Sequence, residues 1–353
     1  MSLMQKVNSR ALALGVPLSV HMDLTYRCNE QCVHCYLDHE DQGEMNTAEI
    51  KCVLDQLAEA GVLFLVFSGG EIFLRRDLFE LVEYARSLTF CLRLKTNGAM
   101  IGEKESDRLA SLHVEAVQVS IYSHRPEVHD GITRLPKSLE RSVAGIRRLR
   151  DHGIRVILAN VLMQQNLKDY AGVKALADEL GAEYTIDPTI TPTMDGERSI
   201  IQLGLDREDL AKVFRNPALV ANPNEFCALP SAIDAEALDE IPCSAGHTAC
   251  YVSPYGDVYP CVQFPLPTGN LRKQKFSEIW HHSPQMKEVR SIRTRDLHVC
   301  STCSHFGICT RCPGLAFLEG NVRGRSSQDC QKSYARTGIL SATMLMKTSS
   351  TMP

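Results

Sequence analysis

The sequence predicts an α/β fold in which a parallel sheet is covered by helices, followed by a small cysteine-rich domain. Strand-like and helix-like segments alternate about six times over residues 18–187, which is the pattern of successive βα units. Past residue 187 this alternation stops, and cysteines become dense between residues 243 and 330. Because six units are too few for a closed eight-stranded barrel, we expect an open sheet with a second unit after it.

Each element of the sheet is assigned from its own pattern. Residues 62–67 are a continuous apolar run, typical of a strand buried on both faces. Asn46 and Thr47 cap a helix whose apolar residues recur at helical spacing. Strands are expected at residues 18–24, 62–67, 90–94, 117–121, 155–159 and 183–186. Helices are expected at residues 47–60, 77–88, 104–112, 138–152 and 167–180.

The chain divides into four parts by the same patterns. Residues 1–187 form the αβ domain, and residues 188–242, which are rich in proline, form a linker region with a helix. The cysteine-rich domain spans residues 243–335, and residues 336–353 form a C-terminal tail.

Composition excludes several classes of protein. The chain has 353 residues, 44% hydrophobic and 23% charged, as in an ordinary globular protein. A formal net charge of −4 argues against nucleic-acid binding, and no apolar run approaches the roughly 20 residues of a membrane span. Residues 1–10 contain no apolar signal core. Fourteen cysteines, clustered at short spacings, favour metal binding in a reducing compartment. We therefore expect an air-sensitive cytoplasmic protein that binds neither nucleic acid nor membrane.

Three cysteines follow directly on the first expected strand. Cys28, Cys32 and Cys35 have the spacing Cys-x3-Cys-x2-Cys, and three thiolates on one loop can each hold one iron of a four-iron cluster. The fourth iron then lacks a protein ligand, and an open metal position indicates a catalytic site. The alternative is a structural zinc knuckle with a distant fourth ligand.

This loop, from Thr25 to Tyr36, resembles the cluster loop of radical S-adenosylmethionine (radical SAM) enzymes. The resemblance implies a partial, open (β/α)6 TIM-like barrel. It also implies that Cys28, Cys32 and Cys35 hold a catalytic 4Fe–4S cluster, and that the amino and carboxylate groups of SAM occupy the open iron.

Further likeness lies just after the strands, where parallel α/β proteins bind ligands. Ser68-Gly69-Gly70-Glu71 follows the second strand. In the family such a turn contacts the methionine amino group of SAM, although two glycines also suit a plain tight turn. A family serine that binds the SAM ribose corresponds to Ser120. The resemblance thus implies cofactor-binding roles for Tyr36, Ser68, Gly69, Gly70, Glu71, Asn97, Ser120 and Arg134.

Two of these assignments leave room for alternatives. Arg134 suits the SAM carboxylate because a guanidinium grips a carboxylate with two hydrogen bonds, but it is equally well a solvated loop arginine. The residue before the third cysteine is usually a hydrophobic aromatic in the family, and here it is His34, followed after the cysteine by Tyr36. The motif therefore leaves the adenine contact open.

The later cysteines resemble the SPASM (twitch-type) extension of radical SAM enzymes, which holds two auxiliary 4Fe–4S clusters. Eight cysteines make two complete sets of four. Only two residues, rather than three, separate Cys309 from Cys312. Alternatively, a Cys-x2-Cys pair at 300–303 with another at 309–312 could form a zinc ribbon. The resemblance implies an inner cluster on Cys243, Cys250, Cys261 and Cys312, and an outer cluster on Cys300, Cys303, Cys309 and Cys330.

Three cysteines have no ligand role in these sets. Cys52 and Cys91 fall within helix and strand patterns and are expected to be ordinary buried core residues. Cys227 lies in the linker region, where packing is the expected role and hydrogen-atom donation near the substrate is the alternative.

The resemblance implies an oxidoreductase that reductively cleaves SAM to a 5′-deoxyadenosyl radical and abstracts hydrogen from a substrate. The SPASM branch includes enzymes of the pyrroloquinoline quinone and mycofactocin pathways. A ribosomally made precursor peptide is therefore expected, to be crosslinked, oxidatively decarboxylated or epimerised (RiPP maturation). The alternatives are oxidation of a tetrapyrrole or sugar side chain and, in another class, a non-catalytic zinc or iron–sulfur binding module. Anaerobic sulfatase-maturing enzymes of the family place Asp at the position of Val262, so the sequence argues against a sulfatase-maturing activity.

Partners follow from the same resemblance. About 17 residues precede the first strand, too few for a peptide-recognition domain, so we expect a separate recognition protein. A flavodoxin or ferredoxin is expected as reductant. The implied cofactors are SAM and three 4Fe–4S clusters, one of which binds SAM and two of which are auxiliary.

Overall fold

The computed structural model describes residues 2–194, 196–228 and 236–339. The expected tail at residues 336–353 lies outside the described residues from 340 onward. The chain forms two compact units, and each is made of two stretches of sequence. The first unit comprises Met1–Gly204 and Ala245–Val289, and the second comprises Leu205–Ser244 and Arg290–Pro353.

The first unit is built on a nine-stranded sheet with the order β6-β5-β4-β3-β2-β1-β7-β8-β9. Neighbouring strands from β6 to β7 are parallel, whereas β8 runs antiparallel to both of its neighbours, β7 and β9. The first six strands confirm the expected βα series. The strands are β1 (Ser19–Thr25), β2 (Phe64–Gly69), β3 (Cys91–Thr96), β4 (Ala116–Ser120), β5 (Val156–Val161), β6 (Glu183–Asp187), β7 (Ala249–Val252), β8 (Asp257–Tyr259) and β9 (Gly269–Asn270).

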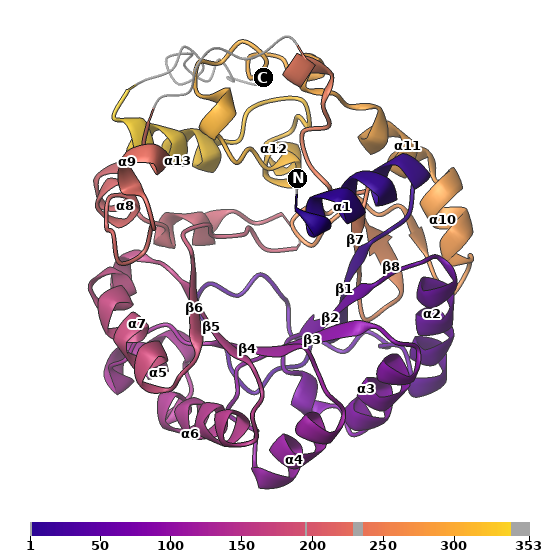
Figure 1. The fold of residues 1–353 in the computed structure, drawn as a ribbon, viewed down its shortest axis with the longest axis vertical. Helices are drawn as coiled ribbons and strands as arrows, with labels where there is room; N and C mark the ends of the chain where they lie inside the picture. Colours follow the sequence, from indigo (N-terminus) through magenta and orange to yellow (C-terminus); the bar gives the residue numbers. More distant parts are fainter. Residues whose placement is uncertain (1, 195, 229–235, 340–353) are drawn as a thin grey trace. The chain divides into compact units, whose positions relative to one another are not determined.

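Helices α2, α3, α4, α6 and α7 lie along the outer side of this curved sheet (Figure 1). Asn46 caps α2, because its side chain accepts from the Glu49 N–H at 3.0 Å and Glu49 accepts from the Asn46 N–H at 2.8 Å. Helices of the first unit are α1 (Leu3–Leu14), α2 (Thr47–Glu59), α3 (Leu78–Ser87), α4 (Glu103–Ser111), α5 (Pro126–Thr133), α6 (Ser138–Asp151), α7 (Tyr170–Glu179), α10 (Phe276–His282) and the start of α11 (Pro284–Ser291), with 3-10 turns η1 (Ile72–Leu74), η2 (Gln164–Asp169) and η3 (Ser199–Leu203).

The main core lies between the sheet and these helices. Val20, Met22 and Leu24 of β1 are fully buried in it, and each such side chain contributes about 1.5–3 kcal/mol of transfer free energy. Successive residues of a strand point to opposite faces. The residues at positions 19, 21, 23 and 25 therefore face the inner side of the sheet, which is where a ligand can be held.

The expectation that residues 62–67 are a strand buried on both faces is wrong in two respects. The strand begins at Phe64, because Val62 and Leu63 complete the turn from α2, and Leu63 is half exposed. Phe64 and Val66 are only partly buried, since they face the inner side of an open sheet rather than a second helical layer.

The second unit is mostly short helices and turns. Helices α8 and α13 pack together, and the Arg215 guanidinium donates to the Ala335 carbonyl at 3.3 Å. Its apolar cluster of Ile292, Leu297 and Cys300 is small, so a bound metal or cluster would add much to its stability. No described helix is both long and apolar enough to cross a membrane. The elements are α8 (Arg207–Phe214), α9 (Pro223–Phe226), η4 (Glu236–Asp239), η5 (Thr294–Asp296), η6 (Phe306–Ile308), α12 (Pro313–Leu318) and α13 (Ser327–Thr337).

Candidate active site

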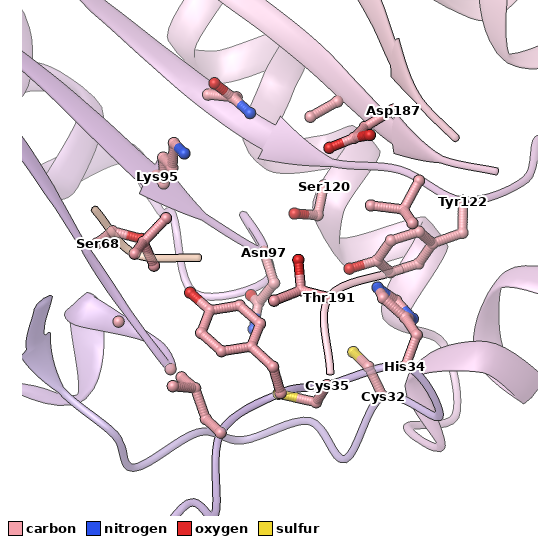
Figure 2. A pocket seen from close by; sticks show the side chains of 18 of the residues that line it. Cys32, His34, Cys35, Ser68, Lys95, Asn97, Ser120, Tyr122, Asp187 and Thr191 are labelled. Atoms are coloured by element: carbon pink, nitrogen blue, oxygen red, sulfur yellow. The ribbon is translucent and has the colours of Figure 1, made fainter. Parts of the chain in front are cut away.

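A cavity of about 580 Å³ lies at the carboxyl ends of the strands in the first unit. Cys28, Cys32 and Cys35, from the loop after β1, line one side of it. Figure 2 shows Cys32 and Cys35 on that side, with Ser120 and Asp187 from the ends of β4 and β6 on another. Clefts of about 300–1,000 Å³ are the usual size for small-ligand sites, and this edge of a parallel sheet is where ligands bind.

Hydrogen bonds hold the cysteine loop in place over the sheet. Where the loop leaves β1, Glu44 accepts from the Thr25 hydroxyl at 2.6 Å. In the middle of the loop, the Gln31 N–H donates to the carbonyl of Thr133 at the end of α5, at 3.0 Å. Helix α5 was not expected from the sequence, and it is one of the supports that position the cysteines.

The three thiols lie in an environment that disfavours their ionisation. Burial raises the pKa of Cys28 to about 12 and that of Cys35 to about 11. Burial also raises the pKa of Cys32, and the Glu30 carboxylate and the other two thiols raise it further. Thiolates here need a bound cation, and the irons of a cluster supply that positive charge. The three residues therefore fit a cluster held by three thiolates.

Gly69 and Gly70 let the turn after β2 lie directly against the cysteine loop. A Cβ on Gly70 would lie 2.3 Å from the Arg27 carbonyl oxygen, and one on Gly69 would lie 2.1 Å from that of Thr25. Gly69 also has φ of 141°, which favours glycine. Close packing on the loop requires both glycines, whatever ligand they contact. Ser68, Gly69 and Gly70 all line the cavity.

Glu71 has a different position from the rest of that motif. It is fully buried and does not line the cavity. Its carboxylate accepts from the Thr96 hydroxyl and the Asn97 N–H, both at 2.8 Å, and from the Phe73 N–H at 3.0 Å. Glu71 therefore joins the turn after β2 to the turn after β3 and fixes the backbone of Asn97.

The other expected cofactor-binding residues divide between the cavity and the surface. Tyr36, Asn97 and Ser120 line the cavity, and the Asn97 amide donates to Asn29 of the cysteine loop at 2.8 Å. Arg134 ends α5, is exposed, and is not among the residues that line the cavity. The structure thus brings all but Glu71 and Arg134 to one wall or another of the same space.

His34, the residue that departs from the family motif, also lines the cavity. Its ring makes an edge contact with Tyr122, with 4.8 Å between centroids. Burial lowers the pKa of His34 to about 4, so its ring is neutral at pH 7. Its Nδ1 atom is buried and receives no hydrogen bond from the described residues. A ligand that carries an N–H donor would satisfy this atom.

Family profiles match both halves of the chain. The Radical SAM superfamily profile matches residues 22–176, and the SPASM iron–sulfur cluster-binding domain profile matches residues 243–304. The chain is 34% identical to a PqqA peptide cyclase of Xanthomonas campestris pv. campestris, covering 92% of this chain and 89% of that protein. The chain belongs to the radical SAM superfamily.

Other radical SAM relatives are similar over most of their length. An AdoMet-dependent heme synthase of Methanosarcina barkeri is 28% identical, covering 86% of this chain and 93% of that protein. The mycofactocin maturase MftC of Mycobacterium tuberculosis is 26% identical, covering 92% and 86%. Among solved structures, Streptococcus suis SuiB bound to the precursor peptide SuiA superposes with a TM-score of 0.73 at 17% identity, covering 92% of this chain and 79% of that one. That likeness confirms the partial-barrel fold.

Four cysteines of the second unit lie close enough to affect one another. Burial raises the pKa of Cys309 to about 11 and that of Cys330 to about 12, and the Cys300 and Cys303 thiols add to both increases. These four are the expected ligands of the outer cluster, and their grouping fits that role. In the expected inner set, Cys250 and Cys261 belong to the first unit, whereas Cys243 and Cys312 belong to the second. No three described His, Cys, Asp or Glu side chains are grouped so as to hold a single metal ion.

The remaining cysteines lie away from the cavity lining. The expectation of a buried Cys52 is wrong, because it lies on the outward face of α2, off the stripe formed by Ile50, Val53 and Leu54, and is exposed. Cys91 is only partly buried at the start of β3. The Cys227 thiol contacts the Phe214 carbonyl at 3.7 Å in the second unit, which agrees with a packing role.

Several lining residues were not expected from the sequence, because cofactor-binding roles were assigned only to residues that match the family motif. Lys95, Gln118 and Asp187 lie within their strands and line the cavity. The signal was present: Lys95 is two residues before Asn97, and Gln118 is two residues before Ser120. A strand repeats its facing direction every second residue, so each lies on the same face as its neighbour.

Proposed function

We propose that the protein is a radical SAM maturase that modifies a ribosomally made precursor peptide. The observation that supports this most is the 34% identity to a PqqA peptide cyclase over nearly the whole of both chains. The mycofactocin maturase relative and the fold of SuiB, solved with its precursor peptide, point to the same class of substrate. Crosslinking, oxidative decarboxylation and epimerisation are all open to such an enzyme.

In this proposal the chain's own residues bind and orient the cofactor. Cys28, Cys32 and Cys35 would hold the SAM-binding cluster, and SAM bound there would supply the radical that takes hydrogen from the substrate. The outer set in the second unit and the inner set of Cys243, Cys250, Cys261 and Cys312 hold two auxiliary clusters. A cytoplasmic flavodoxin or ferredoxin is the proposed reductant, and a separate protein is the proposed carrier of the peptide.

Contacts to SAM come from the residues that share the cavity with the cysteines. Ser68, Gly69 and Gly70 offer backbone groups beside the loop, and Ser120 offers a hydroxyl to the ribose. Tyr36 and His34 line the same cavity, and we propose that they contact the adenine. Glu71 acts by holding Asn97. Arg134 stays a candidate for the SAM carboxylate only if its exposed side chain moves toward the cavity.

The first experiment measures 5′-deoxyadenosine after anaerobic reconstitution with iron and sulfide and reduction with dithionite. The wild-type enzyme should produce it and Cys28→Ala should not. Cys52→Ala is the matched control, because Cys52 is exposed on α2, and it should retain wild-type activity. Production of 5′-deoxyadenosine by Cys28→Ala would refute the cluster assignment.

The second experiment identifies the substrate class. A peptide encoded beside the gene is synthesised with deuterium at its side-chain carbons, and transfer of deuterium into 5′-deoxyadenosine is followed by mass spectrometry. The second candidate function, oxidation of a tetrapyrrole, rests on the 28% identity to an AdoMet-dependent heme synthase over 93% of that protein. Deuterium transfer from a labelled tetrapyrrole, with none from the peptide, would favour it.

A further inference from the structure

Lys95 is a cationic side chain on the cavity wall that the proposed cofactor contacts do not use. It lies near the end of β3, and Gln118 is its register partner on β4; both line the cavity. Figure 2 shows Lys95 on the part of the wall away from Cys32 and Cys35. None of the described residues forms a hydrogen bond or an ion pair with its ammonium group.

Other cations on this sheet are paired. Arg93, two residues earlier on β3, has its guanidinium 2.9 Å from Glu115, and Arg155 lies 2.7 Å from Glu183. Burial lowers the pKa of Lys95. The Asp23 and Asp187 carboxylates raise it, although neither forms an ion pair with the Lys95 ammonium group. An ammonium group set among protein atoms is stabilised when an anion comes into contact with it. In the described part of the chain, Lys95 therefore has no carboxylate in contact with its ammonium group, although Asp23 and Asp187 act on it from a distance.

Bound SAM is a poor source of that counter-ion. SAM has one carboxylate, and in the proposed function it lies with the SAM amino group at the open iron beside the cysteine loop. Asn97 marks that level of the cavity, because its amide contacts Asn29 of the loop. Lys95 is two residues earlier on the same strand face, about 6.6 Å further from the loop. A second molecule must reach that depth.

The surroundings of Lys95 favour a carboxylate over a phosphate. The cavity that Lys95 lines also carries His21 and the neutral amides of Gln118, Asn160 and Gln263, whereas the nearby carboxylates that act on Lys95 are those of Asp23 and Asp187. A phosphate dianion usually binds several cations or a helix N-terminus. A single ammonium with neutral hydrogen-bonding neighbours matches a monoanion that has two oxygen acceptors.

We propose that Lys95 binds a carboxylate of the substrate and so places an acidic group next to the radical chemistry. The inference rests on the proposed function, since it requires that SAM occupy the part of the cavity beside the cysteines. In a peptide the carboxylate is that of a glutamate or aspartate side chain, and in a tetrapyrrole it is that of a propionate. Asp187 opposes binding of either one and tunes its strength.

The test uses the reconstituted full-length enzyme with SAM bound and no reductant, so that nothing reacts. Two probe pairs are titrated under argon by calorimetry. The peptide pair is acetyl-Gly-Glu-Gly-amide and acetyl-Gly-Gln-Gly-amide, and the tetrapyrrole pair is mesoporphyrin and its diamide. Within each pair only the charge of the carboxyl group differs, so the ratio of the two dissociation constants isolates the contact with a cation.

The acidic member of at least one pair should bind wild-type enzyme about 10- to 100-fold more tightly than its neutral twin, as expected for a hydrogen bond to a charged group. Lys95→Met should bring that ratio to about one while leaving the affinity for SAM unchanged. Asp187→Asn should enlarge the ratio. Lys51→Met is the matched control, because Lys51 pairs with Glu80 outside the cavity lining, and it should behave as wild type.

The possible results separate this inference from the proposed function. A wild-type enzyme with no preference for the acidic member of either pair overturns the inference, as does a Lys95→Met variant that keeps the preference. Loss of the preference in Asp187→Asn would also overturn the inference, because Asp187 is expected to oppose binding of the carboxylate. A Lys95-dependent preference in the porphyrin pair alone supports the inference and contradicts the peptide substrate. A Lys95-dependent preference in the peptide pair supports both.

Discussion

Gly70→Ala should separate the cysteine loop from the turn after β2. The new Cβ would lie 2.3 Å from the Arg27 carbonyl oxygen and 2.6 Å from that of Tyr26. Both atoms belong to the backbone and cannot rotate away, so the loop itself must move. That movement stretches the bonds from the Gly70 N–H to the Thr25 carbonyl at 2.8 Å and from the Glu71 N–H to the Arg27 carbonyl at 2.9 Å.

The size of the effect follows from these contacts. Overpacking a tight site costs about 1–3 kcal/mol, and each weakened hydrogen bond costs about 0.5–1.5 kcal/mol. The sum is about 2–6 kcal/mol, which falls on the segment that carries Cys28. We therefore expect less iron retained per chain after reconstitution, a lower unfolding temperature and weaker SAM binding.

Iron is counted by a colorimetric chelator assay, and unfolding is followed by anaerobic calorimetry. Gly131→Ala is the matched control, because a Cβ at Gly131 in α5 meets no atom within 4 Å. It should leave the iron content within error of wild type and should not lower the unfolding temperature, because alanine is a better helix former than glycine. If Gly70→Ala matched Gly131→Ala in both measurements, the close approach of turn and loop would not be the reason for glycine at position 70.

Three further outcomes follow from the structure. Asn46→Ala should lower the free energy of unfolding by about 0.5–2 kcal/mol in denaturant titrations, because it removes the cap of α2; an unchanged value would contradict that role. Burial lowers the pKa of His129 from 6.5 to about 4, and its Nδ1 accepts from the Tyr122 N–H at 3.2 Å. Keeping His129 neutral should therefore contribute about 3 kcal/mol of stability, which is fully present above pH 6.5 and is lost as the pH falls toward 4. Between pH 7 and pH 4, the free energy of unfolding should fall less steeply in His129→Gln than in wild type. Equal slopes would refute this. Cys330→Ser should lose about one third of the bound iron if each of three clusters holds four irons, whereas Cys227→Ser should lose none; equal iron contents would place Cys330 outside the outer set.

Much of the first unit could be predicted because its signals are local. The cap at Asn46 and the apolar runs of the strands each act within a few residues. The position of β7 could not be predicted in this way. Strand β7 pairs in parallel with β1, with Val20 opposite Cys250, across more than two hundred residues of sequence. Hydrophobic periodicity within a segment cannot predict which distant segment it pairs with.

The side chains around the cavity show the same limit. Spacing alone grouped Cys28, Cys32 and Cys35, because ligands on one short loop must be neighbours. It did not show that Glu71 points away from the cavity toward Asn97, since that direction depends on the packing of two turns from different strands. Arg134 has the same difficulty: the residue type suits a carboxylate, but its place at the exposed end of α5 is a property of the fold.

The contrast between the two groups of thiols accounts for the chemistry that each can perform. In the second unit, Cys300, Cys303, Cys309 and Cys330 supply four thiolates, which is enough to close a cluster and to stabilise a unit that has little apolar core. The loop after β1 supplies three and faces a cavity whose far wall carries Lys95, for which the described residues provide no ion-pair partner. A cluster whose irons all have protein ligands has no open position, whereas one that lacks a ligand can bind a small molecule. In the proposed function, the cavity beyond it is where that molecule would meet an acidic substrate.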